Sequence, residues 1–137
     1  MSSIAEAERE IIEEFELFDD WMDKYNYIIE LGKSLPLIDP QYKDDAHLIP
    51  GCQSQVWLHA EMSDGKLFFR ADSDAIITKG IISLLIQVYN GRTAKEILAD
   101  DFSFVESIGL RENLSPTRAN GLNSMIETIR AEAEKNG

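Results

Sequence analysis

The sequence predicts a single α+β domain over residues 1–137, in which a small antiparallel sheet packs against helices. Three patterns support this prediction. Apolar side chains recur every three or four residues over 4–29, apolar and polar residues alternate over 56–62 and again over 67–71, and residues 76–88 are almost continuously apolar. A length of 137 residues with 44% hydrophobic content suits one core. We therefore look for one functional site in one domain.

The first region predicts two helices or one bent helix. Its apolar stripe consists of Ile4, Ala7, Ile11, Phe15, Phe18, Met22, Tyr25 and Ile29. A break near Asp19-Asp20 is expected, because either carboxylate can cap the backbone amides of a new turn that starts at Trp21. The pair Leu35-Pro36 ends the helical region, since proline disfavours helix at the residue before it.

The alternating segment predicts a β-hairpin over residues 55–72, with Ser63-Asp64-Gly65 as its turn. One face of the first strand carries Val56, Leu58, Ala60 and Met62. Residues 46–49 are compatible with a short third strand. The sheet is therefore expected to have two or three antiparallel strands.

The apolar segment 76–88 predicts a helix buried against the sheet, capped by Asp72-Ser73-Asp74 and stopped at Asn90-Gly91. Thr93 and Glu96 have the spacing of a capping box that starts a short helix. A second Ser-x-x-Glu box follows at residues 103–106.

The last predicted helix begins at Ser115-Pro116, where serine is the N-cap and proline the first helical residue. Its apolar face consists of Leu122, Met125, Ile126 and Ile129. Helices therefore flank the hairpin on both sides in the sequence, which is the element order of an α+β domain.

The charge balance is strongly acidic, with a formal net charge of -12. Nucleic acids and anionic membranes would repel such a chain, whereas a neutral or basic protein partner is easier to accommodate. Residues 1–30 hold ten acidic residues against two basic ones, which we interpret as a solvated helix face, with a docking face as the alternative. The chain starts without the pattern of a signal peptide and shows no run of membrane-spanning length. We expect a cytoplasmic protein.

The chain has one cysteine, Cys52, in the polar, turn-like segment Pro-Gly-Cys-Gln-Ser-Gln. A single cysteine cannot form an internal disulfide, and with two histidines it supplies too few ligands for a structural zinc site. Gly51 permits a sharp bend, and Gln53, Ser54 and Gln55 are able to donate hydrogen bonds to a thiolate or persulfide. The thiol is therefore either inert packing or a group that reacts with another molecule.

Two other chemistries fit the thiol less well. A Cys-dependent hydrolase would use His47 or His59 as its base, but no third group or oxyanion-hole motif accompanies them. The chain also lacks a glycine-rich phosphate loop, a dinucleotide fingerprint and paired metal-binding histidines on a helix. An acidic protein-binding adaptor with a structural cysteine is the remaining alternative. No cofactor or metal is expected.

Two charged residues are candidate contacts of the cysteine segment or of a partner. Asp74 is explained as a helix cap, with an influence on the cysteine loop or on a partner interface as the alternative. Arg118 lies near a helix start, where a cation gains nothing from the helix dipole, so a specific partner is expected for it.

Three blocks, GCQSQVWL, DSDAIITKGIISLLIQVYNGRTAKEIL and LSPTRANGLNSMI, resemble in order the SufE family of sulfur-acceptor proteins, which includes the CsdE branch. The resemblance covers roughly residues 10 to 133. It implies a fold like that of the IscU-like iron-sulfur scaffold proteins, although those use several cysteines and this chain has one.

The resemblance also implies that Cys52 accepts persulfide sulfur from a cysteine desulfurase of the SufS or CsdA kind and stimulates its turnover. The sulfur would pass to an iron-sulfur scaffold or another acceptor. Pyridoxal phosphate would belong to the desulfurase. The chain would be a sulfur-transfer accessory protein rather than a stand-alone enzyme.

Overall fold

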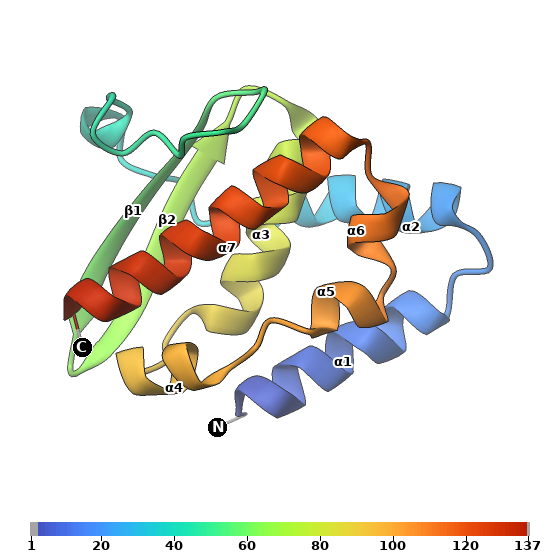
Figure 1. The fold of residues 1–137 in the computed structure, drawn as a ribbon, viewed down its shortest axis with the longest axis horizontal. Helices are drawn as coiled ribbons and strands as arrows, with labels where there is room; N and C mark the ends of the chain where they lie inside the picture. Colours follow the sequence, from blue (N-terminus) through green and yellow to red (C-terminus); the bar gives the residue numbers. More distant parts are fainter. Residues whose placement is uncertain (1–2, 137) are drawn as a thin grey trace.

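The computed structural model describes residues 3–136 as an α+β domain, mostly helical, with one two-stranded antiparallel sheet (Figure 1). The α-helices are α1 (Ile4–Glu16), α2 (Trp21–Leu31), α3 (Ile76–Tyr89), α4 (Ala94–Ala99), α5 (Phe104–Ser107), α6 (Leu110–Asn113) and α7 (Pro116–Asn136). The strands are β1 (Val56–Ser63) and β2 (Lys66–Ser73), and two 3-10 turns are η1 (Gly32–Ser34) and η2 (Pro40–Tyr42).

Two separate helices open the chain, as the break in the sequence pattern predicts. Ser3 begins α1 by accepting a hydrogen bond from the Glu6 amide at 3.1 Å. Asp20 rather than Asp19 caps α2, since its carboxylate accepts from the Asp23 amide at 3.0 Å. The predicted end of the helical region is also confirmed, because α2 stops at Leu31 and passes into η1.

Helix α3 is the centre of the domain, in contact with β2, α1, α2 and α7. Figure 1 shows it behind α7 and beside the hairpin. Nearly all of its side chains are buried. The buried polar residue Ser83 is satisfied, because its hydroxyl donates to the Leu31 carbonyl at 2.8 Å. A Cβ on Gly80 would lie 2.1 Å from the Ile28 carbonyl oxygen, so only glycine permits this approach of α2 to α3. The prediction of a buried helix is confirmed.

The hairpin pairs β1 with β2 in antiparallel register, and Asp64 and Gly65 form its two-residue turn with φ of 52° and 79°. The short third strand considered for residues 46–49 does not form. That segment makes a single bridge, Leu48 to Trp57. Pro50 and the turn at Gly51 follow at once, so the segment leaves the sheet before a strand can develop.

The predicted caps had mixed outcomes. Thr93 and Glu96 form the expected capping box of α4, with reciprocal bonds of 3.1 and 2.9 Å. The box predicted at 103–106 is wrong, because Ser103 already has helical backbone angles and the Glu106 carboxylate pairs with Arg111 instead. Helix α6 follows a left-handed turn at Gly109 and was not predicted.

The cap predicted for α3 at residues 72–74 is also wrong. Strand β2 continues to Ser73, and the N-cap position is Ala75, which has no side-chain cap bond. Helix α7 starts at Pro116 as predicted, with Ser115 Oγ accepting from the Arg118 amide at 3.3 Å. Over residues 3–136, none of the helices has the length and apolar character needed to cross a membrane.

Candidate functional site

Cys52 lies in a loop of residues 50–55. The loop connects the segment that bridges to β1 at Leu48 with the start of β1 itself. The loop is closed at its base by a hydrogen bond of 2.8 Å from the Ile49 amide to the Val56 carbonyl. At its start, Gly51 has φ of +80°, and a Cβ there would lie 2.7 Å from Ser124 Oγ on α7. Glycine is therefore required by both the backbone turn and the close approach to α7.

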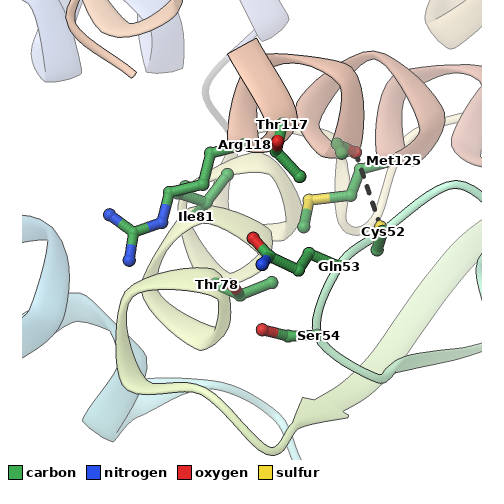
Figure 2. A pocket seen from close by; sticks show the side chains of 9 residues that line it. Cys52, Gln53, Ser54, Thr78, Ile81, Thr117, Arg118 and Met125 are labelled. Atoms are coloured by element: carbon green, nitrogen blue, oxygen red, sulfur yellow. Dashed lines mark hydrogen bonds between the residues drawn. The ribbon is translucent and has the colours of Figure 1, made fainter. Parts of the chain in front are cut away.

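The thiol sits against the N-terminal half of α7. Cys52 Sγ lies 3.8 Å from the Gly121 carbonyl oxygen, the contact drawn as a dashed line in Figure 2. A Cβ on Gly121 would lie 3.5 Å from the sulfur, so the sulfur rests where a larger residue would project. Cys52 is half-buried in this position.

A small pocket of about 60 Å³ opens beside the thiol. It is lined by Cys52, Gln53, Ser54, Thr78, Ile81, Thr117, Arg118, Gly121 and Met125. Drug-sized ligands occupy pockets of about 300–1,000 Å³, so this one suits only a few small atoms. Its walls come from the loop, from α3 and from α7, which lie beside one another in Figure 2.

The electrostatic setting keeps the thiol neutral. Burial raises the pKa of Cys52 above its ordinary value, because the thiolate would lose solvent. Arg118 is the cation of the pocket, but Figure 2 shows its guanidinium group directed away from the sulfur. It donates instead to the Tyr25 hydroxyl at 3.2 Å. The thiol in this conformation is sheltered rather than activated.

Asp74 holds the far end of the cysteine loop. Its carboxylate accepts a hydrogen bond from the Gln55 amide at 3.1 Å, and its own amide donates to the Gln55 carbonyl at 3.3 Å. Gln55 thus contacts Asp74 through its backbone, while Gln53 and Ser54 line the pocket with the thiol. Arg118 also lines the pocket, whereas Asp74 contacts the loop through Gln55 and is not among the residues of the pocket wall.

Several residues of the site were not identified from the sequence. These are Tyr25, Thr78, Ile81, Thr117, Gly121, Ser124 and Met125. Gly121 carried a usable signal, because a glycine inside a helical pattern indicates close approach of another group. The others look like ordinary helix residues, and only the crossing of α3 and α7 brings them to the loop.

Neither histidine is placed to activate the thiol. His47 Nδ1 lies 2.7 Å from Asp44 Oδ1, and His47 Nε2 lies 3.2 Å from His59 Nδ1. Among residues 3–136, those that line the Cys52 pocket include neither ring. The Cys-His pair that a hydrolase needs is therefore not formed in this conformation.

The same described residues contain no group of three or more His, Cys, Asp or Glu side chains positioned to hold a metal ion.

Comparison with known proteins connects this chain to one family. The family description "SufE: Fe-S metabolism associated domain" matches residues 9–133. An uncharacterized SufE-like protein of Rhizobium etli is 43% identical over 130 residues, which cover 91% of this chain and 88% of the relative. One of Rhizobium meliloti is 42% identical over 130 residues, which cover 91% and 93%.

A solved structure has the same fold. The solution structure of a hypothetical protein from Thermus thermophilus superposes with a TM-score of 0.78 at 20% sequence identity, covering 95% of both chains. This likeness confirms the α+β fold.

Proposed function

Since the chain belongs to the SufE family, which is associated with iron-sulfur metabolism, we propose that it is a sulfur acceptor and carrier whose reactive group is Cys52. Its donor would be a cysteine desulfurase of the SufS or CsdA kind, met in the cytoplasm. The sulfur carried on Cys52 would then pass to an iron-sulfur scaffold or another sulfur acceptor. Gly51, Gln53, Ser54 and Gln55 would support the loop, with Asp74 and Arg118 as loop or partner contacts.

The observation that carries the proposal is the position of the thiol. Cys52 is the one cysteine of the chain, and it sits on a short loop beside a pocket of about 60 Å³. A carrier of one sulfur atom needs one thiol and space for one further atom. The half-buried position supports storage, because a persulfide there is shielded from other thiols and oxidants.

The transfer step is an exchange between sulfur atoms. The Cys52 thiolate attacks the outer sulfur of a persulfide on the desulfurase, a new S–S bond forms, and the desulfurase cysteine leaves as a thiolate. The proton released from the Cys52 thiol is available to the leaving thiolate. The number of S–S bonds is unchanged, so no external oxidant or reductant enters the step. Cys52 then carries the sulfur as Cys-S-SH.

Because Cys52 is half-buried against α7, we propose that the loop moves before the attack. Burial disfavours the thiolate, and the thiolate is the nucleophile. Docking that lifts the loop off Gly121 would solvate the sulfur and bring its pKa back toward the ordinary value. Rotation of Arg118 from Tyr25 toward the exposed sulfur would favour the anion further.

The test is the intact mass of the chain after incubation with a cysteine desulfurase and free cysteine. We expect the mass of one added sulfur atom, removed by a reductant, on the wild-type chain. Cys52→Ser is expected to fold normally and gain none, because a hydroxyl is a poor nucleophile toward a persulfide. Ser63→Ala, at the end of β1 and away from the thiol and its loop, is the control substitution and should still gain sulfur.

Two results would reject the proposal. Sulfur on wild type that persists in Cys52→Ser would place the acceptor elsewhere. Desulfurase binding and stimulation that are identical in wild type and Cys52→Ser, with no added mass on either, would identify an acidic adaptor with a structural cysteine.

A further inference from the structure

A shallow hollow of about 510 Å³ lies where helix α1 passes into helix α2. Figure 1 shows the connection between these helices on the side of the domain opposite the hairpin. The hollow is lined by Phe18, Asp23, Asn26, Tyr27, Ile29 and Glu30, and none of these six residues lines the Cys52 pocket. This surface is therefore separate from the pocket at which sulfur transfer is proposed.

The base of the hollow is aromatic. Phe18 and Tyr27 are half-buried, and their ring centroids lie 5.2 Å apart. Tyr27 also packs edge-on against the buried Phe15 ring with centroids 5.4 Å apart, and its hydroxyl donates to the Glu14 carboxylate. These contacts hold the two rings in place, so the base is formed before any partner arrives.

Exposed apolar side chains continue the surface beyond the hollow. Leu17, at the end of α1, is 81% exposed, and Met22, in the first turn of α2, is 66% exposed. Leu17 is the most exposed large apolar side chain among residues 3–136, and Met22 is the third. Such side chains gain free energy when a partner covers them, so their position next to the hollow favours a protein partner.

Two carboxylates stand over the aromatic base. Asp23 and Glu30 are exposed and lie seven residues apart on α2, so they share one face of the helix and are about 10 Å apart along its axis. Asp23 belongs to none of the salt bridges formed within residues 3–136. Glu30 pairs at 3.0 Å with Lys33, an exposed contact that a partner's cation can replace at little cost.

The charge of the chain selects the kind of partner. The net charge is -12, and residues 1–30 hold ten acidic residues against two basic ones. Nucleic acids, anionic membranes and a second copy of this chain would all bring negative charge to this surface, whereas a basic protein segment is attracted to it. Arginine suits the hollow better than lysine, because a guanidinium group both pairs with carboxylates and stacks on aromatic rings.

We propose that the hollow between α1 and α2 binds a basic amphipathic helix of another protein. Two arginines, seven residues apart on that helix, pair with Asp23 and Glu30 beside the rings of Phe18 and Tyr27. Apolar side chains of the same helix cover Leu17 and Met22. This interaction uses a different surface from the Cys52 pocket and stands whether or not Cys52 carries sulfur.

The binding surface is tested by adding a synthetic peptide to the full chain at low salt and following its backbone amides by NMR. The probe is a capped, alanine-based helical peptide with arginines seven residues apart and leucines between them. We expect shifts at the residues of the hollow and at Leu17 and Met22, with the amides of the Cys52 pocket unchanged. Affinity should fall as salt is added, and a peptide with glutamates in place of the arginines should not bind.

A matched pair of double variants separates local contacts from net charge. Asp23→Asn with Glu30→Gln should weaken binding of the arginine peptide about threefold to tenfold, as for the loss of two exposed ion pairs. Glu127→Gln with Glu134→Gln removes two exposed carboxylates at the same spacing from α7 and changes the net charge equally. This control should weaken binding about twofold or less.

The aromatic base is tested by Phe18→Leu, which keeps an apolar side chain and removes the ring. We expect the arginine peptide to bind about twofold to fivefold more weakly. Phe68→Leu is the control, since Phe68 is a partly exposed ring on β2 in the hairpin and should leave binding unchanged. If circular dichroism shows that Phe18→Leu is misfolded, the double variants at exposed positions carry the test.

Three results would reject the proposal. Equal weakening by the two double variants would reduce the attraction to net charge. Absence of binding at low salt, or shifts confined to other surfaces, would remove the hollow as the site. Shifts of the hollow residues that depend on the concentration of the chain without peptide would identify a second copy as the occupant.

Discussion

Helices α3 and α7 support two very different regions at their two ends. Near their N-terminal ends, Thr78, Thr117 and Gly121 meet the cysteine loop around a small pocket. Near their C-terminal ends, Tyr89 and Arg130 meet the segment after α4. We call the first the cysteine end and the second the anchored end.

The anchored end is held by aromatic stacking and hydrogen bonds. The buried Tyr89 hydroxyl donates to Asp100 Oδ2 at 2.6 Å, and Arg130 donates to the Asp100 carbonyl at 3.1 Å. The Phe102 ring stacks on Tyr89 with centroids 4.2 Å apart, and the Arg130 guanidinium lies 4.8 Å from the Phe102 centroid. Each of these contacts uses a side chain that would be costly to leave unpaired or unpacked.

The cysteine end is held by the backbone of its loop and by small residues. Gly51 and Gly121 allow close approach, and Cys52 Sγ makes a long contact of 3.8 Å with a carbonyl oxygen. The same pair of helices therefore has a region held by side-chain contacts at one end and a loop held mainly by its backbone at the other. If the loop moves as proposed, we expect the anchored end to keep the two helices in place.

The largest expected effect comes from loosening the anchored end. Tyr89→Phe leaves Asp100 without its shortest hydrogen bond, so we expect the free energy of unfolding in urea to fall by about 1–3 kcal/mol. Labelling of Cys52 in the native state should not change once global unfolding is subtracted.

Tyr27→Phe is the matched control for this change. Tyr27 also donates to a carboxylate, that of Glu14, but near the surface, and its loss should cost about 1 kcal/mol or less. Native-state labelling of Cys52 that accelerates in Tyr89→Phe would show that the two ends are coupled, contrary to the comparison.

The second effect is a pH dependence that belongs to the anchored end. Burial raises the pKa of Glu8 to about 7, assisted by the neighbouring Asp100. Between the ordinary carboxyl value of 4.5 and about 7, the folded chain holds a proton that the unfolded chain has lost. Stability therefore falls as pH rises through this range. After allowance for the solvent exposure of Glu8, we expect a fall of about 1–2 kcal/mol.

Urea unfolding at several pH values measures this change, and Glu8→Gln should remove most of it. The change belongs to the anchored end, so native-state labelling of Cys52 should not follow it once global unfolding is subtracted. A stability that rises with pH over this range would contradict the assignment to Glu8.

The anchored end also shows why sequence patterns predict some elements and miss others. The boxes at 93–96 and 103–106 have the same spacing, yet only the first forms. In the first box Thr93 and Glu96 bond to each other, whereas in the second Glu106 pairs with Arg111. Local signals predict the hairpin, its turn and the α-helices other than α6. When an ion pair competes for a cap residue, the outcome depends on a residue outside the four-residue pattern of the box.

At the cysteine end, too, local features are predicted from the sequence and contacts between distant segments are not. The loop around Cys52 was identified because its glycine, polar residues and thiol are consecutive in the sequence. The pocket was not, because Thr78 and Thr117 come from helices that are far apart in the chain. For Asp74 the sequence pattern favours a cap of α3 and leaves the cysteine loop as the alternative, and the structure shows its carboxylate bound to the Gln55 amide, 19 positions away in the sequence.

The smallest expected effect on global stability is at Gly51, where the comparison is tested most sharply. Gly51→Ala puts a side chain on a backbone with φ of +80° and a Cβ 2.7 Å from Ser124 Oγ. The backbone strain alone costs roughly 1 kcal/mol, and the loop can relieve it and the contact by moving away from α7. We expect native-state labelling of Cys52 to accelerate several-fold, with a fall in unfolding free energy of about 1 kcal/mol or less.

Gly65→Ala is the matched control, because Gly65 has nearly the same φ, +79°, but no atom within 4 Å of the added Cβ. It should cost a similar free energy of unfolding through backbone strain and leave Cys52 labelling unchanged, since the hairpin turn is remote from the thiol. Comparable acceleration in both variants would mean that labelling follows global stability. Acceleration in Gly51→Ala alone identifies the contact of the loop with α7 as what shelters the sulfur.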